Sequence, residues 1–173
     1  MSKTTLRYVI MYCLLLLAQV VVLNRLVLFN CAIPLAFIYV ITVLPVSLTT
    51  NRSVALGFFT GLIVDAFMDT YGLNALCCTV LAFVRKPILH MYVLRDDEQT
   101  AQPLDMHSLG TPVFLKYTLT MTLIYCAMFF LVEAFSFFDM QHLLLRTAAS
   151  TLYSFIVICA VSGLYNTHRE KRL

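Results

Sequence analysis

Apolar segments follow one another along nearly the whole of this chain, with only short polar connections between them. Hydrophobic residues make up 61% of the sequence and charged residues 12%, which is far too apolar for a soluble domain of 173 residues. One helical crossing needs roughly 20 residues, so there is room for about six crossings. We predict a single integral membrane domain over residues 1–173, an all-α polytopic bundle of about six transmembrane helices at about 8–23, 28–48, 54–68, 72–90, 113–134 and 142–164.

The first apolar run has the general form of a signal peptide, because Lys3 and Arg7 precede it. It contains Gln19, however, and it ends at Asn24 and Arg25 without a small-residue cleavage motif. We therefore expect an uncleaved first span that inserts the chain into the membrane.

The basic residues predict the orientation of the bundle. If both termini are cytoplasmic, only Arg25 and Arg146 lie toward the outside. Such a bias toward one side selects the topology with the N- and C-termini inside. The remaining basic residues then lie at inner ends or inner loops: Lys3, Arg7, Arg52, Arg85, Lys86, Arg95, Lys116, Arg169, Lys171 and Arg172.

The inner end of the fourth span is interrupted by Arg85, Lys86 and Pro87. The apolar residues 73–84 alone would rise only about 18 Å, short of a hydrocarbon core of about 30 Å. Either the two basic side chains snorkel and the helix continues, or the helix breaks at Pro87 and the chain turns along the inner interface. We favour the break, followed by a cytoplasmic loop over about 91–112, and we expect Pro45 to kink the inner end of the second span.

Small and acidic residues recur every four positions in the third span, at Gly57, Gly61, Asp65 and Asp69. At about 100° per residue this spacing forms one slowly winding stripe along a helix. The two glycines allow close approach of another helix, either of the same chain or of another subunit. These residues are our helix-packing and interface candidates, together with Gly72, which we expect to shape the outer turn.

Asp65 is the strongest candidate in this stripe. A carboxylate at membrane depth costs about 2.5–3.5 kcal/mol and normally faces protein or water. An ion or proton relay needs further acidic groups at depth, and no other predicted span has a central carboxylate. We therefore expect Asp65 to organise the outer end of a helix contact rather than to transport an ion.

Glu133 and Arg146 lie at the outer ends of the fifth and sixth spans, on either side of one short connection. Each would be costly without a partner near lipid, so we expect them to form an ion pair.

Catalytic and metal-binding patterns are missing from the sequence. The six cysteines and four histidines are scattered without CxxC or metal-ligand spacing, and no hydroxyl or thiol has a partner base at motif spacing. We expect no enzyme activity, no cofactor and no metal. A basic patch interleaved with aromatic residues is also missing, so we expect no nucleic-acid partner.

The run from Gly57 to Asp65 (GFFTGLIVD), followed by Asp69 to Gly72 and the sequence LNAL, resembles the rod shape-determining protein MreD family. The later segments FLKY, LVEAFSF and LLLR are also similar to this family. Gly57, Gly61 and Asp65 match the family core position by position, and the match is looser after Asp69.

This resemblance implies a non-enzymatic, multi-pass scaffold or regulatory subunit of the cell-elongation machinery in the bacterial inner membrane. The implied partners are the membrane-anchored protein MreC, a RodA-type glycosyltransferase with its class B penicillin-binding transpeptidase, and MreB filaments. The implied fold is similar to the substrate-binding subunits of energy-coupling-factor vitamin transporters.

A second hypothesis follows from that similarity of fold, namely a small-molecule-binding subunit of a vitamin-type transporter. Such subunits dock through an AxxxA-like first span. Residues 8–23 contain only Ala18, which weakens this hypothesis.

Overall fold

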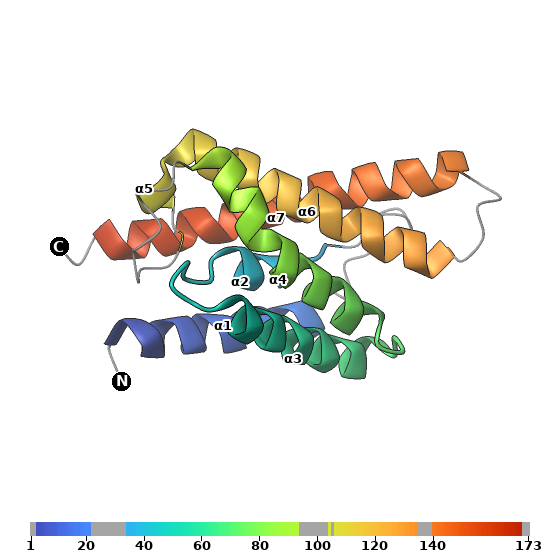
Figure 1. Ribbon diagram of the computed structural model, residues 1–173, viewed down its shortest axis with the longest axis horizontal. Helices are drawn as coiled ribbons and strands as arrows, with labels where there is room; N and C mark the ends of the chain where they lie inside the picture. The colour runs from blue at the N-terminus through green and yellow to red at the C-terminus, as the bar shows by residue number, and fades with distance from the viewer. Residues whose placement is uncertain (1–2, 22–33, 94–103, 105, 135–139, 171–173) are drawn as a thin grey trace.

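The computed structural model describes residues 3–21, 34–93, 104, 106–134 and 140–170 (Figure 1). All regular structure in these residues is helical. The helices are α1 (Lys3–Val21), α2 (Ile38–Thr42), α3 (Thr50–Met68), α4 (Leu73–Tyr92), α5 (Met106–Leu109), α6 (Thr111–Ala134) and α7 (Met140–Glu170). The predicted all-α class is thus confirmed, and each of the six predicted spans contains a helix.

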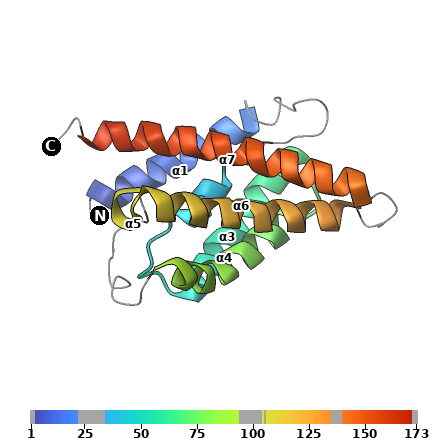
Figure 2. The same cartoon turned by 90° about the horizontal axis from the view of Figure 1, so that it is seen from above.

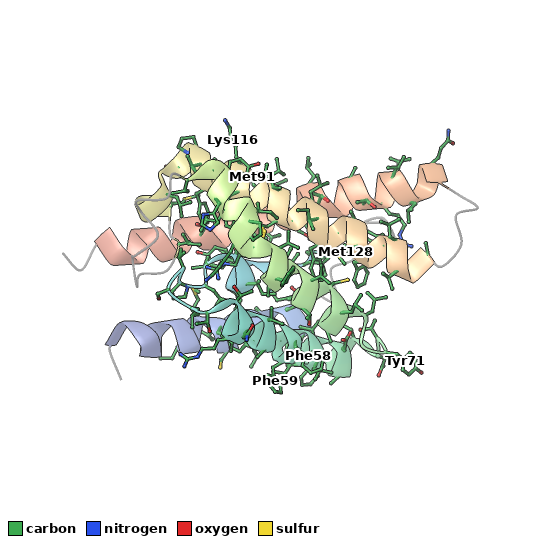
Figure 3. The ribbon with its side chains drawn as sticks, viewed as in Figure 1. Phe58, Phe59, Tyr71, Met91, Lys116 and Met128 are labelled. Carbon is green, nitrogen blue, oxygen red and sulfur yellow. The ribbon has the colours of Figure 1, made fainter. Side chains whose placement is uncertain are left out.

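The long helices place the chain's turns at two opposite ends of the molecule (Figures 1 and 2). One end holds the start of α1, the end of α7 and the short helix α5. The other end holds the turn between α3 and α4, marked by Tyr71 in Figure 3. We call these the terminal end and the turn end.

Three helices are long and apolar enough to cross a membrane by length and composition: Leu73–Tyr92, Thr111–Ala134 and Leu143–Gly163. A shorter apolar helical stretch covers Ile10–Val21. The outer surface is also apolar, because large hydrophobic side chains on every long helix are exposed. Among them are Phe59 and Phe67 on α3, which are 60% and 62% exposed. Phe58 and Phe59 point away from the bundle in Figure 3.

The second predicted span, 28–48, is wrong as a continuous membrane-length helix. Within its described part, α2 is a five-residue helix and the flanking residues form turns. Pro45 has no backbone N–H and disfavours helical geometry at Leu44, so a helix cannot run through this position easily. The apolar run was misleading because a segment buried by protein on all sides has the same composition as one buried by lipid.

The expected break at Pro87 is also wrong, because α4 runs through this proline to Tyr92. Proline removes one backbone hydrogen bond of the helix and makes a kink more favourable. Here Ile88 and Leu89 directly after it are buried in the core and hold the last turn of α4 in place. Arg85 does not snorkel either, since only 1% of it is exposed.

Residues 34–45, which we call the central segment, lie at the heart of the fold. Leu35, Ala36, Phe37 and Ile38 are completely buried, although much of this segment is not helical. Its backbone polar groups therefore need partners other than the helix itself, because an unpaired buried amide is costly.

Side chains from α1 and α7 supply partners at the start of the central segment. The Gln19 amide donates from Nε2 to the carbonyl oxygen of Pro34 at 2.8 Å, and its Oε1 accepts from the backbone N–H of Ala36 at 2.9 Å. The hydroxyl oxygen of Ser154 accepts from the N–H of Leu35 at 2.9 Å. Gln19 and Ser154 are themselves completely buried.

Side chains from α4 and α6 supply partners at its other end. The Tyr117 hydroxyl donates to the carbonyl oxygen of Thr42 at 3.5 Å, and the Arg85 guanidinium donates to that of Leu44. The N–H of Leu104 donates to the carbonyl oxygen of Val43 at 3.2 Å. Four long helices thus each direct one polar side chain at the same buried backbone.

We predict that Gln19→Leu destabilises the protein by about 2–6 kcal/mol, because it leaves one donor and one acceptor of the central segment unpaired at roughly 1–3 kcal/mol each. The unfolding midpoint in detergent is measured with a thiol-reactive dye, since Cys77, Cys78 and Cys126 are buried free thiols. Leu17→Ala is the control, because Leu17 is 62% exposed on the same helix. Equal midpoints for the two variants would contradict the role of Gln19.

Candidate functional site

The glycine stripe of α3 packs directly on α4. A Cβ atom added at Gly57 would lie 2.7 Å from the carbonyl oxygen of Cys78 and 2.9 Å from the Cβ of Ala82. A Cβ atom added at Gly61 would lie 2.5 Å from the carbonyl oxygen of Asn74. At both glycines the nearest atoms of α4 belong to its backbone, which cannot move aside as a flexible side chain can, so only glycine allows this approach. Of the two partners that the sequence left open, the structure puts a helix of the same chain against these glycines.

The Asp65 carboxylate continues this stripe and accepts hydrogen bonds from the start of α4. Its Oδ1 accepts from the N–H of Asn74 at 2.9 Å, and its Oδ2 accepts from the N–H of Ala75 at 2.8 Å. These are the second and third residues of α4, whose N–H groups have no acceptor within the helix. Asp65 thus caps the neighbouring helix, and its negative charge lies at the positive end of that helix dipole.

Asn74 extends this capping contact to a third helix. Its Nδ2 donates to Asp65 Oδ1 at 2.9 Å and to the Thr70 hydroxyl oxygen at 2.9 Å. Its Oδ1 accepts from the Tyr125 hydroxyl of α6 at 2.6 Å, and the Thr70 hydroxyl donates to Asp65 Oδ1 at 2.5 Å. Asp65, Asn74 and Tyr125 are all at least 95% buried. This cluster ties α3, α4 and α6 together at the turn end.

The turn that carries this cluster uses two residues with positive φ. Asp69 ends α3 at φ 54°, and Gly72 precedes α4 at φ 78°. Glycine is favoured in this region, and aspartate tolerates it better than most residues. Asp69 is exposed, and Tyr71 is fully exposed and points away from the protein (Figure 3).

Glu133 and Arg146 lie together at the same end of the molecule. Arg146 Nη2 is 3.8 Å from Glu133 Oε1, and the guanidinium carbon lies 5.1 Å from the centre of the Phe130 ring. The two charged side chains are 41% and 38% exposed, so in water such a pair would contribute only about 0–1 kcal/mol. Their contact joins α6 to α7 next to the connection between them.

Sequence reasoning missed Asn74, Gln19 and Arg85 as structural residues. For Asn74, the sequence offers only the presence of an amide side chain near the predicted start of a span, which does not identify its partners. The sequence does not indicate the hydrogen-bond partners of Gln19 and Arg85, because these partners lie 15 and 41 residues away along the chain.

The described residues contain no group of three histidine, cysteine or acidic side chains that could hold a metal ion. The buried acid of the stripe is already engaged by four hydrogen bonds from its own chain. The chemistry of this candidate site is therefore the assembly of helices.

We predict that Asp65→Asn lowers the free energy of unfolding by about 1–3 kcal/mol. The substitution removes the charge at the start of α4 and puts an NH₂ group where one oxygen now accepts. Asp69→Asn is the matched control, because that side chain is exposed and asparagine tolerates a positive φ. Thermal unfolding of both variants, followed by dye labelling of the buried thiols, checks this; equal loss in both would refute the capping role.

We also predict that Gly61→Ala forces α3 and α4 apart and costs about 1–3 kcal/mol, as overpacking of a rigid contact does. Gly163→Ala is its control, since an added Cβ there meets nothing within 4 Å and alanine favours a helix. The same unfolding assay should show a lower midpoint for the first variant and an unchanged or higher midpoint for the second. A neutral Gly61→Ala would mean that the two helices can separate freely.

Comparison of this chain with protein-family models, with curated proteins and with solved structures finds no match. The resemblance of the GFFTGLIVD run to the MreD family therefore stays a prediction from the residues themselves. What the structure adds is the internal use of Gly57, Gly61 and Asp65.

Proposed function

We propose that this protein is a non-enzymatic scaffold or regulatory subunit of the bacterial cell-elongation machinery, as in the MreD family. The observation that carries the proposal is the engagement of Asp65. Its carboxylate is fully used in capping α4 and in joining α6, so the most conspicuous acidic group of the chain has a structural role. This favours a protein that acts through its shape and its surfaces.

Among the exposed surfaces, we propose the apolar outer face of α3 and the turn between α3 and α4 as the ones that contact partners. The α3 face presents Phe58, Phe59 and Phe67 in exposed positions, and the turn presents Asp69 and Tyr71. A membrane-anchored MreC-like protein could contact both, through its transmembrane helix on the face and its external part on the turn. A RodA-type glycosyltransferase and a class B penicillin-binding transpeptidase would join the same assembly.

The proposed location is the bacterial inner membrane, with both termini in the cytoplasm and the turn end outside. Lys116 lies toward the terminal end (Figure 3), and Lys86 lies in the second half of α4. Asp69 ends α3 at the turn end, and Glu133 lies in the last turn of α6, so the charges have the distribution that the positive-inside tendency favours. The terminal end would then be the part within reach of MreB filaments.

The test is assembly and cell shape in a rod-shaped host that encodes this chain. We expect the tagged protein to co-purify with the MreC-like protein, and depletion of the chain to convert rods into round cells. Asp65→Asn should insert into the membrane but recover less of the partner, because the turn that Asp65 holds would lose its fixed geometry. Asp69→Asn leaves the cap intact and is the control, so it should recover the partner like the original protein. Tyr71→Ala tests the turn surface directly, because it changes an exposed side chain of the turn and should lower the recovery of the partner if the turn is the contact.

Rod-shaped growth of a clean deletion strain would overturn the proposal. A vitamin that remains bound to the purified protein and is found by mass spectrometry would favour the transporter-subunit hypothesis instead.

A further inference from the structure

Arg85 is a buried cation that has no acidic partner among the described residues. It is 1% exposed, and its Nη2 donates to the carbonyl oxygen of Leu44. Its Nε and Nη1 atoms are buried and have no hydrogen-bond partner among the residues that the structure describes. A guanidinium stays charged, and leaving its N–H groups unpaired in a protein interior is costly. The position therefore favours an additional acceptor that carries negative charge.

A second unpaired donor lies on the neighbouring helix. Ser53 is 1% exposed, and within the described part of the chain its hydroxyl has no hydrogen-bond partner. Gly61 packs against Asn74, and Gly57, one helical turn earlier in α3, packs against Cys78. The two helices are therefore antiparallel along this contact: a move of four residues toward the start of α3 corresponds to a move of four residues toward the end of α4. The same register places Ser53 opposite the turn of α4 that contains Arg85.

The start of α3 adds unused donors close to this position. The N-cap residue of this helix, Thr49, makes no side-chain hydrogen bond to its first N–H groups. The first N–H groups of a helix have no acceptor within it and carry the positive end of the helix dipole. Leu44, which receives the Arg85 hydrogen bond, lies only five residues before Thr49 in the chain.

The charges around this position all have one sign in the described part of the chain. Arg52 is exposed next to Ser53, and Lys86 is half-buried next to Arg85. The acidic side chains that the structure describes, Asp65, Asp69 and Glu133, lie toward the turn end. Nothing near Arg85 in these residues neutralises it.

We propose that Arg85 and Ser53, with the uncapped start of α3, form a binding site for the phosphate group of an anionic phospholipid. Arg52 and Lys86 lie at the rim of this site and favour a headgroup with net negative charge. An arginine fork and neighbouring N–H and O–H donors match the oxygens of a phosphate. Basic sites between transmembrane helices near a membrane surface are known to select anionic lipid headgroups.

A lipid is favoured over free phosphate as the source of this group. The surrounding helix surfaces are apolar, with Leu56 on α3 and Phe83 on α4 exposed near the same end of the contact. These faces would accommodate acyl chains while the phosphate binds the cations.

The test uses the full chain, delipidated in a non-ionic detergent and then titrated with phosphatidylglycerol or phosphatidylcholine vesicles. Labelling of the buried cysteines reports the unfolding midpoint. A ligand that binds only the folded protein raises this midpoint in a saturable way. We expect a saturable rise with phosphatidylglycerol and a much smaller one with phosphatidylcholine.

Arg85→Gln should weaken the apparent affinity for phosphatidylglycerol by about tenfold or more, which is the loss of at least one charged hydrogen bond. Arg85→Lys keeps the charge but loses the fork, so it should bind with intermediate affinity. Arg146→Gln is the control cation at the turn end, and it should titrate like the original protein. If Arg85→Gln does not fold, Ser53→Ala, which removes only a hydroxyl, takes its place and should also weaken binding.

Equal effects of the two lipids on the original protein would overturn the proposal. So would unchanged affinity in Arg85→Gln, or in Ser53→Ala if that variant replaces it. An equal, saturable rise with inorganic phosphate alone would assign the site to free phosphate and overturn the lipid headgroup as its ligand.

Discussion

The fold depends on satisfying the backbone of the central segment without water. A non-helical segment buried among apolar side chains cannot leave its N–H and C=O groups unpaired. Four different helices each provide one side chain that forms hydrogen bonds with this backbone: Gln19, Ser154, Tyr117 and Arg85. The central segment therefore sets where these helices lie, since each must bring one polar group to a fixed backbone atom.

The α3–α4 hairpin follows a different principle, which is close approach followed by capping. Gly57 and Gly61 let the two backbones touch, and this contact puts the Asp65 carboxylate beside the N–H groups that begin α4. The cost of burying the acid is offset by four hydrogen bonds and by the helix dipole. Through Asn74 and Tyr125 the same acid positions α6, so a single carboxylate links three helices.

The two ends of the molecule differ in how their charges are compensated. At the turn end, the Asp65 carboxylate accepts four hydrogen bonds, and Glu133 forms an ion pair with Arg146. At the terminal end, Arg85 donates to one backbone carbonyl and interacts electrostatically with the Tyr117 hydroxyl, but it has no acidic side chain as a partner among the described residues. Among the described residues, the unneutralised cation Arg85 therefore marks the terminal end as the place for the anion site that we propose.

The sequence by itself determined the all-α class, the apolar outer surface, the stripe of Gly57, Gly61 and Asp65, and the pairing of neighbouring Glu133 and Arg146. These features depend on composition and on residues a few turns apart, which helical periodicity places on known faces. Only the tertiary structure decided that the second apolar run is a buried central segment, that α4 continues through Pro87, and that Arg85 is buried. Each of these depends on partners far along the chain, and burial by protein leaves the same apolar pattern as burial by lipid.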